Sequence, residues 1–127
     1  MEKTAISTDK APRAIGPYSQ AVKYGDLVFV SGQIAIDPNS GKLIDVMDVG
    51  KQTEQVMQNI KAILNEAGLD FSHVIRVTMF LTSMDDTSVV NEVYAQYFSE
   101  PYPARAIGSV SALPMGARLE IELVAGS

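Results

Sequence analysis

The strongest helical pattern of this 127-residue chain is the segment VGKQTEQVMQNIKAILNEA, residues 49–67. Its apolar residues recur at steps of one, three and four positions, which places them on one face of an α-helix. They are Val56, Met57, Ile60, Ile63, Leu64 and Ala67. Such a stripe must be buried against another element of the fold. Gly68 follows it and is expected to end the helix in a left-handed conformation.

Segments with strand character lie on both sides of this predicted helix. They are rich in apolar and β-branched residues, and they are 27–30, 34–36, 74–81, 104–110 and 119–125. Residues 19–22 are expected to join 27–30 through a turn at Gly25-Asp26.

A second helix is expected after Asp85-Asp86-Thr87, because these side chains suit a helix N-cap. Pro101 and Pro103 end this helix. Its apolar stripe consists of Val89, Val90, Val93, Tyr94, Tyr97 and Phe98. The order of elements is therefore β-β-β-α-β-α-β-β. It predicts an α+β fold in which two helices pack on one face of a mixed sheet, in one domain over residues 1–127. The other face of the sheet would stay open and favours an oligomer.

The composition excludes several classes of protein. Apolar residues make up 46% and charged residues 20% of the chain, which is typical of a globular domain. There is no Cys and only one His, His73, so disulfides, thiolate metal sites and His-rich zinc centres are excluded. The net charge of −5 argues against nucleic acid as a partner. Neither a membrane span nor a secretory signal is visible, so we expect a cytoplasmic protein.

Arg105 and Glu120 are the first candidates for chemistry. Arg105 begins a predicted strand after Pro103-Ala104, where a guanidinium can bind a carboxylate through two parallel hydrogen bonds. The alternative is an ordinary ion pair with a nearby acid. Glu120 lies on the strand face opposite Ile121, where a half-buried carboxylate can orient or deprotonate a water. Its alternatives are a solvated position or an ion pair with Arg105 or Arg118.

Weaker candidates lie earlier in the chain. Tyr18 follows Gly16-Pro17 in a restricted loop and is either a ligand contact or a packing residue. Ser31-Gly32-Gln33 interrupts an apolar strand, which indicates either a close backbone approach to a ligand or a simple β-bulge. We expect His73 at the surface, and helix capping explains Asp85-Asp86 better than a metal site does.

Six short motifs resemble, in order and spacing, those of the YjgF/RidA (Rid) family. They are IGPYSQA at 15–21, VSGQ at 30–33, AGL at 67–69, VN..Y at 90–94, PAR at 103–105 and LEIE at 119–122. The resemblance extends from about residue 4 to residue 125 and is nearest to the RidA type, the enamine/imine deaminases.

The resemblance implies a chorismate-mutase-like α+β fold and a homotrimer. The sheets of three subunits would form an inner β-barrel, with the ligand sites between subunits. The implied reaction is hydrolysis of 2-aminoacrylate and 2-aminocrotonate, as 2-iminopropanoate and 2-iminobutanoate, to 2-keto acids and ammonia. This hydrolase activity protects pyridoxal-phosphate enzymes and needs no cofactor and no metal.

The resemblance also assigns roles to residues of this chain. Arg105 would bind the substrate carboxylate, Glu120 would hold the water, and the backbone of Ile107 would contact the polar group at C2. Tyr18 and Ser31-Gly32 would line the pocket, with Asn91 beside it. Two positions depart from the family. Ile107 stands where RidA-type members commonly have Cys, and Met115 stands where Lys often follows Leu-Pro.

Two other functions stay open at this point. A non-catalytic binder or sensor of small keto or amino acids would use the same Arg105. Some members of the family have been described as endoribonucleases or translation inhibitors, but the net charge and the lack of paired histidines argue against this activity here.

Overall fold

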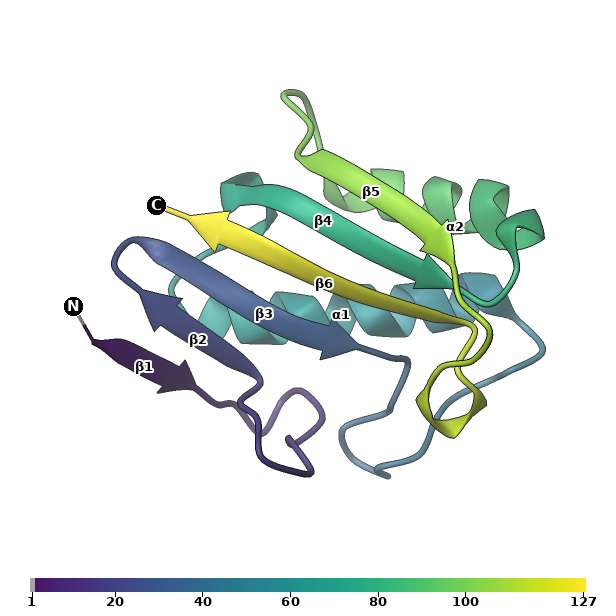
Figure 1. Ribbon diagram of the computed structural model, residues 1–127, viewed down its shortest axis with the longest axis horizontal. Coiled ribbons are helices and arrows are strands. Elements are labelled where there is room, and N and C mark those ends of the chain that lie inside the picture. Colours follow the sequence, from purple (N-terminus) through teal and green to yellow (C-terminus); the bar gives the residue numbers. More distant parts are fainter. Residues whose placement is uncertain (1) are drawn as a thin grey trace.

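The computed structural model describes residues 2–127 and has a sheet of six strands covered on one face by two helices (Figure 1). The strands are β1 (Lys3–Ile6), β2 (Ala21–Tyr24), β3 (Leu27–Gln33), β4 (Val74–Leu81), β5 (Ala104–Ser109) and β6 (Leu119–Gly126). The helices are α1 (Val49–Glu66) and α2 (Thr87–Tyr94).

The sheet is mixed, with the strand order β1-β2-β3-β6-β4-β5. Only β4 and β5 run parallel, and α2 connects them. All other neighbours are antiparallel, including β2 and β3, which the predicted turn at Gly25-Asp26 joins. The α+β class with both helices on one face is therefore confirmed.

α1 supplies the helical side of the core. The stripe residues Val56, Ile60, Ile63 and Leu64 are fully buried and belong to one cluster with the strand residues Val28, Val77, Met79, Leu119 and Ile121. Asp48 caps the helix by accepting a hydrogen bond from the backbone N–H of Lys51 at 3.0 Å. Gly68 follows the helix with φ of 75°, as predicted.

The other face of the sheet carries no helix. We call it the open face. The residues on it, which are paired with one another across neighbouring strands, are Val22, Phe29, Arg76, Thr78, Phe80, Glu120, Glu122 and Val124. Leu27 and Phe29 of β3 keep 38% and 45% of their surface exposed there. The strict alternation along β6 places its leucines and isoleucine against the helices and its two glutamates on the open face.

Three details differ from the sequence-based prediction. β1 was not predicted, because a four-residue edge strand leaves little pattern. Residues 34–36 form no strand of their own, and only Ile36 makes an isolated bridge, to Leu43. α2 ends at Tyr94 and continues as a short 3-10 helix, Ala95–Tyr97, so the predicted stripe up to Phe98 spans two elements.

The cap of α2 also differs. Asp86 is its N-cap residue but makes no capping hydrogen bond, because its carboxylate pairs instead with Arg118. In the part of the chain from residue 2 to 127, no helix has the length and apolarity needed to cross a membrane.

Candidate active site

Arg105 lies in β5, at the edge of the sheet, and faces α2. Its register partner in β4 is the buried Val77, so its side chain leaves the sheet on the helix side. Nη1 donates a hydrogen bond of 2.7 Å to Oδ1 of Asn91, and the guanidinium lies 5.1 Å from the ring centre of Tyr94. Asn91 and Tyr94 lie three residues apart in α2 and so present neighbouring side chains.

The partners of Arg105 are neutral at ordinary pH. Burial raises the pKa of the Tyr94 hydroxyl, although the charge of Arg105 acts in the opposite direction. Within residues 2–127 no carboxylate lies within ion-pair distance of Arg105, so the simple ion pair is not what the structure contains. The guanidinium is exposed, oriented and uncompensated, which is what binding of an external carboxylate requires.

A hollow of about 360 Å³ adjoins this guanidinium. It is lined by Asn91, Tyr94, Ala95, Tyr102, Pro103 and Arg105. Ile107 follows in β5 on the same side, opposite the buried Met79, and is itself half-buried. We call Asn91, Tyr94, Arg105 and Ile107 the arginine half-site.

Glu120 lies on the other face of the sheet. Its register partner in β4 is Phe80, and its side chain is half-buried on the open face. Burial raises the pKa of this carboxyl, and the like charge of Glu122 raises it further. Glu120 pairs with neither Arg105 nor Arg118, since Arg118 pairs with Asp86 at 2.8 Å.

Gly32 lies directly against Glu120. A Cβ atom at position 32 would come within 2.7 Å of the Glu120 Cδ, so only glycine leaves room for this carboxylate. The register of β3 against β6 shifts between Val30 and Gln33, as expected for the β-bulge that was one of the two interpretations of Ser31-Gly32-Gln33.

Ser31 directly precedes Gly32 in β3, and Tyr18 lies in the loop before β2. The Ser31 hydroxyl donates to the carbonyl of Ser19 at 2.6 Å, which ties the loop carrying Tyr18 to β3. Tyr18 is 53% exposed, and its hydroxyl accepts a hydrogen bond from the backbone N–H of Ile15 at 3.4 Å. We call Tyr18, Ser31, Gly32 and Glu120 the glutamate half-site.

The two half-sites do not meet within one chain. β4 lies between β5 and β6, so the strands of Arg105 and Glu120 are two strand spacings, roughly 10 Å, apart. Arg105 is also level with Leu123 of β6, three residues along the strand from Glu120. Their side chains also leave the sheet on opposite faces. Within one chain the arginine half-site and the glutamate half-site therefore cannot contact the same small molecule.

The remaining candidates have structural contacts. His73 accepts a hydrogen bond from the backbone N–H of Asp70 at 3.0 Å and belongs to a capped turn. Among residues 2–127, no three His, Cys, Asp or Glu side chains are grouped so that they could hold a metal ion. Two larger hollows, of about 730 and 630 Å³, involve the 7–15 loop and the outer face of α1, and neither contains a residue of the half-sites.

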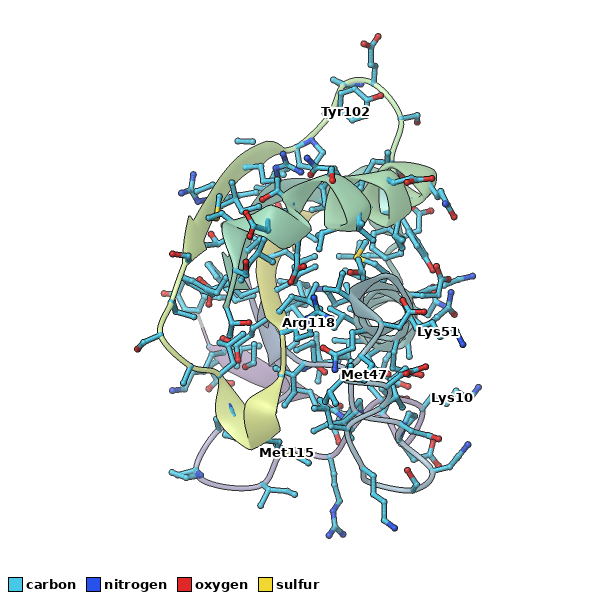
Figure 2. All side chains as sticks on the ribbon, turned by 90° about the vertical axis from the view of Figure 1, so that its right-hand side faces the viewer. Lys10, Met47, Lys51, Tyr102, Met115 and Arg118 are labelled. Atoms are coloured by element: carbon cyan, nitrogen blue, oxygen red, sulfur yellow. The ribbon has the colours of Figure 1, made fainter. Side chains whose placement is uncertain are left out.

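Two residues that line the hollow beside Arg105 were not among the sequence-based candidates. Tyr94 was assigned to the apolar stripe of its helix, although its spacing of three from Asn91 already placed both on one face. Tyr102 lies in the loop before β5 and is 60% exposed (Figure 2). The only sequence signal that pointed to it is that it directly precedes Pro103-Ala104-Arg105.

Comparisons with known proteins match nearly the whole chain. The family model described as Endoribonuclease L-PSP matches residues 8–127. A human protein named 2-iminobutanoate/2-iminopropanoate deaminase is 48% identical over 123 residues, which cover 97% of this chain and 89% of the human one.

Solved structures agree with this match. YyfA of the conserved Rid protein family, from Yersinia pestis, superposes with a TM-score of 0.96 at 46% identity, over 99% of this chain and 100% of its own. TdcF from E. coli, solved with bound serine, superposes with a TM-score of 0.92 at 42% identity, over 98% of both chains. The chain therefore belongs to the Endoribonuclease L-PSP family, which is the YjgF/Rid family that its motifs resemble.

Proposed function

We propose that this protein is an imine deaminase that hydrolyses 2-iminopropanoate and 2-iminobutanoate, the tautomers of 2-aminoacrylate and 2-aminocrotonate. Water adds to the imine carbon, the carbon–nitrogen bond breaks, and a 2-keto acid and ammonia leave. The observation that carries this proposal is the exposed guanidinium of Arg105, held by the neutral Asn91 and Tyr94 and not neutralised by any acid among residues 2–127. The name of the human relative supports the reaction.

Arg105 binds the substrate carboxylate in this proposal. A 2-imino acid offers a planar carboxylate next to its electrophilic carbon, and a guanidinium fork fixes such a group in one orientation. Asn91 occupies one of the N–H groups, which leaves others for the ligand. The backbone of Ile107, two residues along β5, then faces the polar group at C2.

Glu120 holds the water that adds to the imine carbon. Its raised pKa makes it a better proton acceptor than an ordinary carboxylate, provided that it is ionised at the working pH. Gly32 leaves space at this carboxylate, and Tyr18 and Ser31 line the same side. Because an imine is already electrophilic, orientation of the two reactants supplies most of the rate enhancement.

The complete site forms between two subunits of a homotrimer. The arginine half-site of one subunit would face the glutamate half-site of its neighbour, which explains why one chain separates Arg105 from Glu120. The open face supports an assembly, because a sheet face with Leu27 and Phe29 exposed is normally covered. In a closed ring each subunit then contributes one half to each of two sites.

A coupled assay tests the reaction. A serine or threonine dehydratase is run so that spontaneous imine hydrolysis limits the appearance of the keto acid, and the protein is then added. We expect faster keto-acid formation, and a loss of roughly 100-fold or more in Arg105→Ala, since a charged bidentate contact is removed. Full activity of a correctly folded Arg105→Ala would refute the role of this residue.

A non-catalytic binder is the second candidate, because TdcF was solved with bound serine. The same Arg105 would hold the carboxylate of such a ligand. Calorimetric binding of 2-oxobutanoate without any imine hydrolysis would favour this function. The family description also names an endoribonuclease, and RNA cleavage that is lost in Arg105→Ala would favour that activity instead.

A further inference from the structure

Arg118 and Asp86 form an ion pair that neither half-site contains. Nη2 of Arg118 lies 2.8 Å from Oδ1 of Asp86, and their side chains are only 30% and 12% exposed. In Figure 2, Arg118 lies near the middle of the view, below Tyr102 and above Met115. This is the most buried of the ion pairs within residues 2–127.

Each partner is attached to a different half-site. Asp86 is the N-cap residue of α2, the helix whose Asn91 and Tyr94 hold the guanidinium of Arg105. Arg118 directly precedes β6 and lies two residues before Glu120. The pair is therefore a direct side-chain link between the element that orients Arg105 and the strand that carries Glu120.

Arg118 is itself fixed from several sides. Its Nη1 donates to the carbonyl of Val46 at 3.2 Å, and its backbone N–H donates to the side chain of the fully buried Gln52 at 3.1 Å. Its carbonyl accepts from the backbone N–H of Thr82, at the end of β4, at 3.1 Å. The start of β6 thus has one defined position relative to α1, β4 and α2.

Stability alone does not explain this pair. Oδ2 of Asp86 is buried without a hydrogen-bond partner, so the carboxylate is only half satisfied. Buried ion pairs of this kind are often no more stabilising than apolar residues of the same volume. What an ion pair does supply is a defined direction and distance between the two elements that it joins.

We infer that the Asp86–Arg118 pair is a positioning device. It fixes the position of α2, and with it Arg105, relative to β6 and Glu120. The inference rests on the proposed function, because it assigns catalytic use to both half-sites. In a homotrimer the two half-sites of one chain belong to two different active sites. The pair would therefore position the groups of neighbouring sites relative to one another.

The test compares Asp86→Asn with a matched control, Asp85→Asn. Asp85 is the adjacent acid, is exposed and makes no ion pair among the described residues. Each variant is assayed well below its unfolding midpoint, for imine hydrolysis in the coupled assay and for calorimetric binding of 2-oxobutanoate. A displaced reactive group typically costs between tenfold and a hundredfold in rate.

For Asp86→Asn we expect about a tenfold loss of kcat/KM and a several-fold weaker Kd for 2-oxobutanoate, while Asp85→Asn stays within about twofold of the unmodified protein. Arg118→Met should give a similar loss. The double variant Asp86→Asn, Arg118→Met should be no worse than the worse single variant, because both remove one interaction.

The outcomes separate this inference from the proposed function. A lower unfolding midpoint with unchanged kcat/KM and Kd in Asp86→Asn would make the pair merely structural and overturn the inference. Additive losses in the double variant would overturn it as well. If the unmodified protein binds 2-oxobutanoate but hydrolyses no imine, the proposed function fails, and the Kd of the variants still decides whether the pair positions Arg105.

Discussion

Arg105 shows how neutral partners can orient a charged side chain. An arginine on an edge strand usually finds a carboxylate, and here it is held by an amide and an aromatic ring. Neutral partners fix the direction of the guanidinium without cancelling its charge. The charge is therefore available to a ligand that enters the hollow beside Tyr94 and Tyr102.

Removal of the amide partner should weaken the site while the charge remains. In Asn91→Ala the guanidinium loses its 2.7 Å hydrogen bond and becomes mobile, so we expect about tenfold weaker binding of 2-oxobutanoate by calorimetry. The neighbouring exposed Glu92→Ala is the control and should bind normally. Equal affinity in both variants would show that Asn91 does not orient Arg105.

Gly32 allows a test of the space around Glu120. The added Cβ of Gly32→Ala would lie 2.7 Å from Glu120 Cδ and must displace the carboxylate, so we expect at least a tenfold loss of imine hydrolysis. Gly108→Ala is the matched control, because a Cβ there meets nothing within 4 Å in the chain. Both variants are checked by light scattering for an unchanged assembly, and normal turnover by Gly32→Ala would remove Glu120 from the mechanism.

At the level of elements, the alternation of β6 places both Glu120 and Glu122 on the open face. Burial is the larger cause that raises the pKa of Glu120, and the charge of Glu122 adds to it. Glu120 must be ionised to accept a proton from water, so activity should fall as the pH drops through a pKa above the ordinary value of 4.5.

Glu122→Gln should therefore move the acid limb of the pH–rate profile to lower pH. The substitution removes the like charge and lowers the pKa of Glu120, while burial keeps it above the ordinary value. The profile of kcat/KM is measured with Glu92→Gln as the control, which should leave the limb in place. A limb that stays unchanged, or moves to higher pH, in Glu122→Gln would contradict this electrostatic coupling.

The buried apolar stripe of α1 packs against the sheet and is expected to stabilise the fold. Its contribution to stability can be tested separately from the site. Ile60 is fully buried, so Ile60→Ala should lower the free energy of unfolding by about 2–5 kcal/mol. The adjacent exposed Lys61→Ala should change it by less than about 0.5 kcal/mol. Denaturant unfolding followed by circular dichroism measures both changes. Equal free energies of unfolding for the two variants would show that Ile60 is not part of the core.

The elements that could be predicted from the sequence are those whose apolar residues recur with helical spacing, or alternate strictly with polar ones, over many positions. α1 and β6 show this, because their apolar residues repeat over many positions. β1 is a short strand at the sheet edge, and only its pairing with β2 makes it visible. Asp86 is the N-cap residue of α2, as predicted, but its carboxylate makes no capping hydrogen bond, because it pairs with Arg118, 32 residues away.

The sequence names candidate residues for the site but not their arrangement in space. The motifs named Arg105, Glu120, Gly32 and Tyr18, and the alternation along β6 gave the face of Glu120. The face of Arg105 depends on the parallel register of β5 against β4, which no local pattern encodes. Only the sheet order shows that β4 separates the two side chains.

For the whole molecule, the open face and the divided site have one explanation. In the proposed homotrimer, a second copy would cover the exposed Leu27 and Phe29 and would also bring a second set of half-sites close to the first. A trimer closed by rotation repeats this contact at every interface. The proposed activity is then a property of the assembly and not of the single chain.

The decisive measurement mixes two inactive variants. Arg105→Ala and Glu120→Gln chains are unfolded together in equal amounts, refolded, and assayed for imine hydrolysis beside each variant alone. If sites form between subunits, a site is intact when one neighbour supplies Arg105 and the other supplies Glu120, so about one quarter of the unmodified activity should return. Each variant alone should stay nearly inactive. A mixture as inactive as its components would contradict a site shared between subunits.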